Sequence, residues 1–238
     1  MEIIMKIFFV LSLLILSGFS YGQNIYIEFA SITNGRLSKD ALIINDSISI
    51  YKSDSDNSPT LQEKSFLIKK HVENAIYLRE GLFNQLFYVK DSLHSMEWKL
   101  TNDTKLILTE ECFSAKTYFR GRNYTAYYTT AITNSDGPWK FGGLPGLILE
   151  IKSDDNHIQF IAEKIKTNYT EQFEQVKIND HKFMNWDEYV NKFINTIDKY
   201  IRLVRSNGSI DNSSKANIKI DAPEIIYPKA QEGEGISF

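Results

Sequence analysis

Residues 24–33 read Asn-Ile-Tyr-Ile-Glu-Phe-Ala-Ser-Ile-Thr, and this stretch decides the fold class. Apolar and polar side chains alternate with a period of two until the turn pair Asn34-Gly35, which is typical of a β-strand with one buried face. Residues 41–51 repeat the alternation, and shorter strand-like segments follow at residues 65–71, 75–80, 85–90, 97–100 and 105–109. We therefore expect a chain built mainly from antiparallel strands.

Two further pairs of strand-like segments predict hairpins. Residues 112–119 and 124–131 flank Arg120-Gly121-Arg122-Asn123, which predicts a hairpin with a four-residue loop. Residues 147–152 and 157–165 flank Ser153-Asp154-Asp155-Asn156 in the same way.

One segment near the C-terminal end has the period of a helix instead. Asn185 and Glu188 have the spacing of a capping box, and Gly208 is a stop signal. Between them, apolar residues recur every three or four positions, at Trp186, Tyr189, Val190, Phe193, Ile194, Ile197, Tyr200, Ile201 and Val204. The predicted fold class is therefore α+β and mostly β, with a curved antiparallel sheet and one long amphipathic helix packed on one face. An open half-barrel is one form that such a sheet could take.

The first 22 residues predict an export signal. Lys6 precedes a ten-residue apolar run, and small residues stand at Ser20 and Gly22, as before a signal-peptidase cut. The apolar run is too short for a transmembrane helix, which needs about 20 residues. We expect residues 1–22 to be a signal peptide, residues 23–221 a single β-rich domain and residues 222–238 an extended tail. The protein would then be periplasmic, associated with the outer membrane or extracellular, with no transmembrane span in the mature chain.

Composition excludes several classes of function. A net charge of -3 and a pI near 5.9 give no electrostatic reason to expect nucleic acid. A single cysteine excludes a disulfide framework within the chain. The four histidines, His71, His94, His157 and His181, lack the spacing of metal ligands. We expect no metal, no cofactor and no catalytic residue that a motif would identify.

Glycine and proline concentrate between residues 137 and 146, which read Gly-Pro-Trp-Lys-Phe-Gly-Gly-Leu-Pro-Gly. A Leu-Pro-Gly triplet suits a type II turn with Pro145 and Gly146 at its central positions. A solvated loop would not need Trp139, Phe141 and Leu144. We therefore expect the loop to fold inward onto the core.

The segment Gly143-Leu-Pro-Gly-Leu-Ile148 resembles the signature of the GLPGLI family of secreted bacterial proteins, and the similarity extends over residues 96–152. Tyr127 departs from that pattern, which has Trp there. The resemblance implies a cell-envelope location and a mainly structural role for the motif, and it implies no reaction. The residues that carry the motif are Cys112, Gly121, Gly137, Pro138, Trp139, Phe141, Gly143, Leu144, Pro145, Gly146, Leu147 and Ile148.

Two features near the predicted hairpin could bind or react. Arg120 and Arg122 at its tip precede Tyr124, Tyr127 and Tyr128, and guanidinium groups beside aromatic rings can bind carboxylates, phosphates or sugars. Such arginines can equally cap an exposed turn. Cys112 could be a nucleophile, although a small buried side chain on a strand is the interpretation that we favour.

The sequence favours a non-catalytic binding or carrier module for an apolar, lipid-like or envelope-derived ligand. The alternatives are a docking module for an outer-membrane protein, which would use the arginine tip, and an enzyme that uses Cys112.

Overall fold

The computed structural model describes residues 24–54, 66–83, 85–93, 96–170, 178–206, 217–218, 224–227, 230–231 and 235–237. The predicted signal peptide lies outside these residues. The strands are β1 Ile25–Thr33, β2 Arg36–Ile44, β3 Ile48–Ser53, β4 Leu67–Lys70, β5 Ala75–Leu82, β6 Gln85–Ser92, β7 Lys99–Ile107, β8 Glu110–Phe119, β9 Arg122–Thr129, β10 Leu147–Ser153, β11 Ile158–Lys166, β12 Met184–Asn185, β13 Asn217–Ile218, β14 Ala230–Gln231 and β15 Gly235–Ser237. The helices are the 3₁₀ turn η1 Ile178–Asp180 and α2 Trp186–Ser206.

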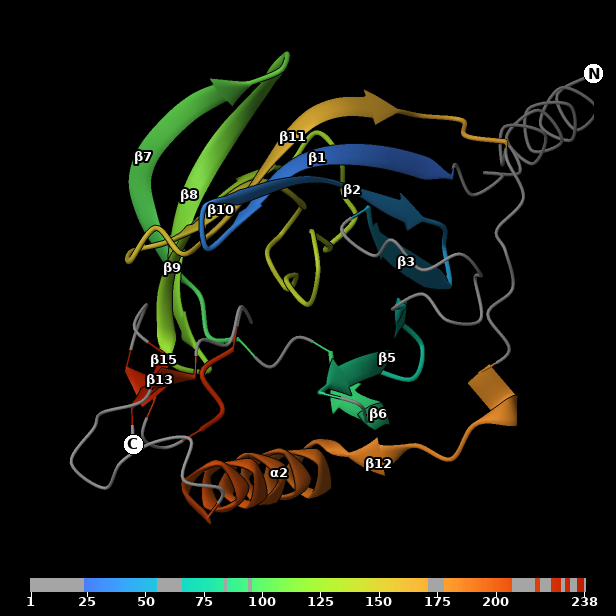
Figure 1. The fold of residues 1–238 in the computed structure, drawn as a ribbon. Coiled ribbons are helices and arrows are strands. Elements are labelled where there is room, and N and C mark those ends of the chain that lie inside the picture. The colour runs from blue at the N-terminus through green and yellow to red at the C-terminus, as the bar shows by residue number, and fades with distance from the viewer. Residues whose placement is uncertain are drawn as a thin grey trace, which may run out of the picture.

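Twelve strands form one curved sheet in the order β12-β6-β5-β4-β3-β2-β1-β11-β10-β9-β8-β7. Two meanders, β1 to β6 and β7 to β11, are joined by the antiparallel pairing of β1 with β11. β12 joins β6 in parallel, and every other pairing in this sheet is antiparallel. The sheet curves strongly without closing (Figure 1), so the predicted mostly β, open and curved architecture is confirmed.

The alternation at the start of the chain determines which face of β1 is buried. Ile25, Ile27 and Phe29 point into the core, while the residues between them are only half buried. The register places Ile27 opposite Leu42 of β2, so apolar side chains of neighbouring strands meet on one face. This face contributes to the main hydrophobic cluster.

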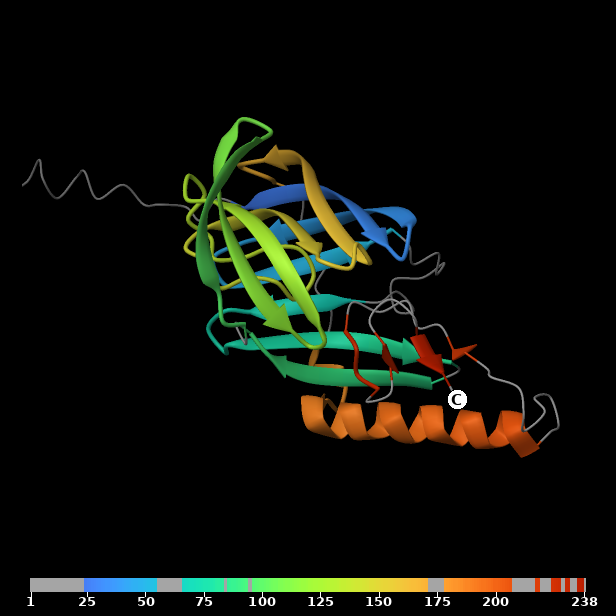
Figure 2. The ribbon, with the colours of Figure 1, turned by 90° about the vertical axis from the view of Figure 1, so that its left-hand side faces the viewer.

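The helix α2 begins at the capping box that the sequence predicts. The backbone amide of Glu188 donates to the Asn185 Oδ1 atom at 2.9 Å, and the amide of Asn185 donates to Glu188 Oε2 at 3.1 Å. Tyr189, Phe193, Ile197 and Ile201 form its buried face, which packs beside β5 and β6 (Figure 2). The predicted stop at Gly208 lies outside the described residues.

The β8–β9 hairpin is tighter than the sequence predicts. Its tip is the pair Arg120-Gly121, with φ values of 43° and 97°, instead of a four-residue loop. Positive φ at both central residues is the signature of a type I′ turn, whose twist matches that of paired strands. Asn123 and Arg122 therefore belong to β9.

The C-terminal part of the chain returns to the body of the protein. The backbone amide of Ile225 donates to the Arg120 carbonyl at 2.9 Å, and Tyr227 is buried. β13, β15 and β14 form a small separate sheet. Among the described residues, no helix is both long and apolar enough to cross a bilayer.

Candidate functional site

The Gly- and Pro-rich loop between β9 and β10 lies within the curve of the sheet, where Figure 1 shows it in yellow-green. Trp139, Phe141 and Leu144 are buried, as predicted. The Phe141 ring centroid lies 4.9 Å from that of Tyr124 and 5.3 Å from that of Trp139. The loop therefore fills much of the concave side of the sheet with its own aromatic side chains.

A buried lysine holds this loop in place. Lys69 of β4 has no exposed surface, and its ammonium group donates to Asp136 Oδ1 at 2.5 Å, to the Gly137 carbonyl at 2.7 Å and to the Phe141 carbonyl at 2.8 Å. Three donors thus meet three acceptors. Burial lowers the pKa of Lys69, and the charge of Asp136 opposes that shift.

A serine and a histidine complete the network around Asp136. Ser49 donates to Asp136 Oδ2, and the Ser49 Oγ atom lies 2.8 Å from His71 Nε2. Burial lowers the pKa of His71. Ser49 is fully buried, whereas a catalytic nucleophile has to be accessible to its substrate. We therefore interpret this network as structural.

The Leu-Pro-Gly triplet does not form the predicted type II turn. The Gly146 amide donates to the Leu144 carbonyl at 2.7 Å, which closes a three-residue turn centred on Pro145. Gly146 has a φ of 155°, and a Cβ at this position would lie 2.1 Å from the Thr129 carbonyl oxygen. Close approach of the β9 backbone therefore requires glycine here.

The two tip arginines form ion pairs inside the chain, so neither simply caps an exposed turn. The Arg120 Nη1 and Nη2 atoms each donate to the Asp91 carboxylate at 2.7 Å. Arg122 is almost fully buried, and its Nε atom donates to Asp155 at 3.0 Å. Arg120 and Arg122 thus pair with two different acidic residues, and the sequence reveals neither partner.

The three tyrosines after the tip face different surroundings. Tyr124 and Tyr128 are buried on the concave face, whereas Tyr127 is half buried on the opposite face beneath the Lys105 ammonium, 3.8 Å from its ring centroid. The structure therefore does not gather Arg120, Arg122 and the three tyrosines into one exposed surface. Whether any of them binds a ligand stays a prediction.

Cys112 is fully buried on β8, in agreement with the structural interpretation. Burial raises the pKa of its thiol to about 11. The thiol is therefore protonated at neutral pH, which is unfavourable for a nucleophile.

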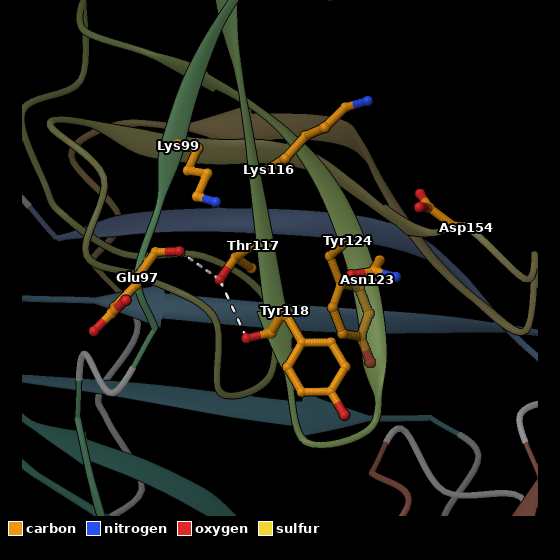
Figure 3. Close-up of a pocket in the computed structure, with 8 residues that line it drawn as sticks. All are labelled: Glu97, Lys99, Lys116, Thr117, Tyr118, Asn123, Tyr124 and Asp154. Carbon is orange, nitrogen blue, oxygen red and sulfur yellow. Dashed lines mark hydrogen bonds between the residues drawn. The ribbon is translucent and has the colours of Figure 1, made fainter.

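Residues of β7, β8 and β9 and of the β10–β11 turn line an open cavity of about 490 Å³. Tyr118 is 67% exposed there, and Figure 3 shows its ring at the end of the β8–β9 hairpin, with the Lys116 side chain farther along β8. The lining residues are Glu97, Lys99, Lys116, Thr117, Tyr118, Asn123, Tyr124 and Asp154. The lining of the cavity thus includes an exposed aromatic ring together with carboxylate, ammonium and amide groups.

Strand register explains how these residues meet. Lys99 of β7 pairs with Lys116 of β8, and Tyr118 pairs with Asn123 of β9. The Asp154 amide donates to the Asn123 carbonyl at 3.0 Å, which brings the β10–β11 turn to the same place. The Thr117 hydroxyl donates to the Glu97 carbonyl at 2.8 Å and fixes the start of β7.

Sequence reasoning missed this cavity and the two buried lysines, Lys69 and Lys140. A charged residue within an apolar strand, as in Leu67-Ile68-Lys69, was the available signal for the first. No sequence signal distinguished the exposed Tyr118, because an aromatic residue on an alternating strand lies in the core as often as on the surface. Among the described residues, no group of three or more His, Cys, Asp or Glu side chains could hold a metal ion.

Comparisons with known proteins identify the fold. Two structures of PNGF-II, in C2 and P21 space groups, give TM-scores of 0.52 and 0.56 at 18% and 16% identity. They cover 68% and 71% of this chain but only 31% and 32% of their own, so this chain spans about a third of their length. A LolA superfamily protein, NE2245 from Nitrosomonas europaea, covers 61% of this chain and 85% of its own at 9% identity, and its TM-score of 0.26 carries no argument. No curated protein matches the sequence.

The family match corrects the resemblance to the GLPGLI family. The family model that matches, over residues 38–191, is described as "N-glycanase peptide, N-terminal domain". This match and the PNGF-II structures contain no support for GLPGLI membership, so that interpretation is wrong. Because residues 38–191 make up more than half of the sequence, the chain belongs to the family of N-glycanase N-terminal domains.

Proposed function

We propose that this chain is a non-catalytic module that binds an oligosaccharide in the cavity beside Tyr118. The exposed Tyr118 ring within a polar cavity is the observation that carries the proposal. The matching family is named for an N-glycanase, and the part that matches is its N-terminal domain. Since the chain spans about a third of the PNGF-II chains, the activity in the family name is not transferred to it.

The composition of the cavity suits a sugar. A pyranose has one face of C–H groups that can pack on an aromatic ring, while its hydroxyl groups donate and accept hydrogen bonds around the rim. Asn123 offers both donors and acceptors, Asp154 offers acceptors, and Lys116 offers donors. The cavity thus offers one aromatic surface and several polar groups, the two kinds of contact that a small-molecule site provides.

An apolar ligand on the concave face is less well supported than a sugar on the outer face. Phe141 and Leu144 of the Gly- and Pro-rich loop are buried there, next to Lys69 and its acceptors. A carrier would have to displace this loop. An outer-membrane partner and export through residues 1–22 stay predictions, and both are compatible with a glycan-binding module.

Titration of the full chain with an N-linked glycopeptide, and with the same peptide after removal of the glycan, tests the proposal. We expect binding that depends on the glycan and that weakens at least tenfold in Tyr118→Ala, about 1.4 kcal/mol. Phe83→Ala is the matched control, because Phe83 is 51% exposed and is not among the lining residues. Equal binding of the two peptides, or equal loss in both variants, would overturn the proposal.

A further inference from the structure

A second group of charged residues lies where the β8–β9 tip meets β6, the start of α2 and the C-terminal segment, residues 224–227. Besides the bidentate pair with Asp91, Arg120 donates to Glu224. The Lys140 ammonium donates to both Glu224 oxygens, at 2.8 and 2.9 Å, and lies 3.5 Å from Asp91. Lys140 is 1% exposed and the Glu224 side chain 5%. Four charged groups from distant parts of the chain therefore share one desolvated site.

Two tryptophans form apolar walls around these cations. The Arg120 guanidinium carbon lies 3.3 Å from the ring centroid of Trp186, and the Lys140 ammonium lies 4.2 Å from the same centroid. The Lys140 ammonium also lies 5.1 Å from the ring centroid of Trp139, the preceding residue in the loop. Aromatic faces stabilise cations without neutralising them. The two rings therefore add to the stabilisation of the cations but do not replace their carboxylate partners.

The charges balance only when Glu224 is in place. Arg120 and Lys140 supply two positive charges, and Asp91 and Glu224 supply two negative ones. Asp91 uses both oxygens on Arg120 and approaches Lys140 no closer than 3.5 Å. Without Glu224, the buried Lys140 ammonium would keep only the Asp91 oxygen at 3.5 Å, which already accepts from Arg120, and a buried cation with so weak a partner is costly. The site therefore requires a carboxylate at this position from whichever molecule supplies it.

Two further polar contacts join the segment that supplies Glu224 to other described residues, and Tyr227 also belongs to the hydrophobic core. The Ile225 amide donates to the Arg120 carbonyl at 2.9 Å, and the Tyr227 hydroxyl donates to Asp198 of α2 at 2.6 Å. The Ile225 side chain occupies the space beside Gly121, where a Cβ would lie 2.5 Å from the Ile225 Cβ. The segment thus lies against the β8–β9 turn, with the Glu224 carboxylate between Arg120 and Lys140 and the Ile225 side chain beside Gly121.

We propose that Arg120, Lys140, Trp139 and Trp186 form a binding site for extended peptides that carry a glutamate carboxylate, and that residues 224–227 occupy it as an intramolecular ligand. An external peptide of the same chemistry exchanges with this segment. Because the segment is tethered, its effective concentration at the site is on the order of millimolar, and a free peptide must compete with that value.

A neighbouring carboxyl group gives the site a pH dependence. The charges of Lys140, Glu224 and Asp91 act on the Glu80 carboxyl group of β5, and Glu80 in turn acts on the Tyr189 hydroxyl. Burial raises the pKa of Glu80 to about 7, and Lys140 opposes this shift. When Glu80 ionises, a third carboxylate charge acts on the site beside those of Asp91 and Glu224.

Peptide binding to the full-length Glu224→Gln chain tests the site. The probe is a capped peptide with the sequence of residues 222–228, Ala-Pro-Glu-Ile-Ile-Tyr-Pro, and its partner has Gln in place of Glu. We expect the Glu peptide to bind at least tenfold more tightly than the Gln peptide, and to bind wild-type chain more weakly than the variant. The quenching of tryptophan fluorescence from Trp186 and Trp139 reports occupancy.

Two further chains separate a specific site from general adhesion. In Glu224→Gln with Lys140→Met, both partners of the main ion pair are removed, so folding is expected to survive and the preference for Glu to disappear. In Tyr227→Phe, every charge of the pocket is kept and only the contact with Asp198 is lost, so the Glu peptide should bind more tightly than to wild type. Equal binding of both peptides, a preference that survives Lys140→Met, or no gain in Tyr227→Phe would each overturn the proposal.

Discussion

The Lys69 ammonium is the clearest case of one side chain that determines the path of a distant loop. Its three acceptors belong to residues 136, 137 and 141, so a single group on β4 fixes both ends of the turn that carries Trp139. The Gly137 amide also donates to Asp136 Oδ1 at 2.7 Å. Every donor in this network has an acceptor, which is the condition for a buried ion pair to be tolerated.

Lys69→Met is expected to destabilise the protein by about 3 to 5 kcal/mol, because it leaves the buried Asp136 carboxylate and two carbonyl groups without their donor. Urea unfolding monitored by tryptophan fluorescence measures the change. Lys70→Met is the matched control, since Lys70 is partly exposed and pairs with the exposed Glu73, and its cost should stay below about 1 kcal/mol. Similar losses in both variants would contradict the role given to Lys69.

At the level of elements, the β8–β9 tip is a junction and not a free end. Arg120 adopts a left-handed conformation, with a φ of 43°, while its side chain bonds Asp91 of β6 and its carbonyl accepts from Ile225. A non-glycine residue tolerates this conformation only when its surroundings compensate for it. The turn, β6 and the C-terminal segment therefore stabilise one another.

Arg120→Ala is expected to lower the free energy of unfolding by more than about 2 kcal/mol, because the buried carboxylates of Asp91 and Glu224 would lose a cationic partner. Arg202→Ala, on the exposed face of α2, provides the comparison and should change stability by less than about 0.5 kcal/mol. Thermal or chemical unfolding checks both values. If Arg120→Ala changed stability as little as Arg202→Ala does, the β8–β9 tip would be a free surface loop and not a junction.

The elements could be predicted from the sequence because their signals are local. Alternation in residues 24–33 and the Asn185–Glu188 capping box each depend on residues a few positions apart, and the structure contains both. The ion pairs could not be predicted in this way. Lys69 and Asp136 lie 67 residues apart, and Lys140 and Glu224 lie 84 apart, so only the completed sheet brings them together.

At the level of the whole molecule, the open sheet depends on contacts between its two ends. Residues 93–98 connect β6, next to one end of the sheet, to β7 at the other, and a chain of this length spans at most about 25 Å. The ends must therefore approach each other, although they lie at opposite ends of the strand order. The bidentate pair of Arg120 with Asp91 lies across this gap, since it joins the β8–β9 tip to β6. Among the described residues, this ion pair joins the two ends of the sheet, which are not paired as strands.

This closure should make stability depend on pH through Glu80. The pKa of Glu80 is raised from 4.5 to about 7 by burial, so the folded protein holds a proton that the unfolded chain releases. The corresponding stability is fully present below pH 4.5 and is lost as pH rises through 7. Asp91 acts in the opposite sense, because burial alone would raise its pKa but hydrogen bonds from Arg120 and the charge of Lys140 lower it.

Glu80→Gln isolates the contribution of this carboxyl group, because glutamine is neutral at every pH and has a similar shape. Between pH 5 and pH 8, we expect wild-type stability to fall relative to that of Glu80→Gln by on the order of 2 kcal/mol. Subtracting the two unfolding free energies at each pH removes the effect of His71, whose lowered pKa changes stability in the opposite direction over the same range. Two parallel pH profiles would mean that Glu80 is ionised throughout. In that case Arg120 and Lys140 together would neutralise the carboxylates of Asp91, Glu224 and Glu80. The junction would then have one more negative charge than the two cations and two carboxylates that the distances indicate.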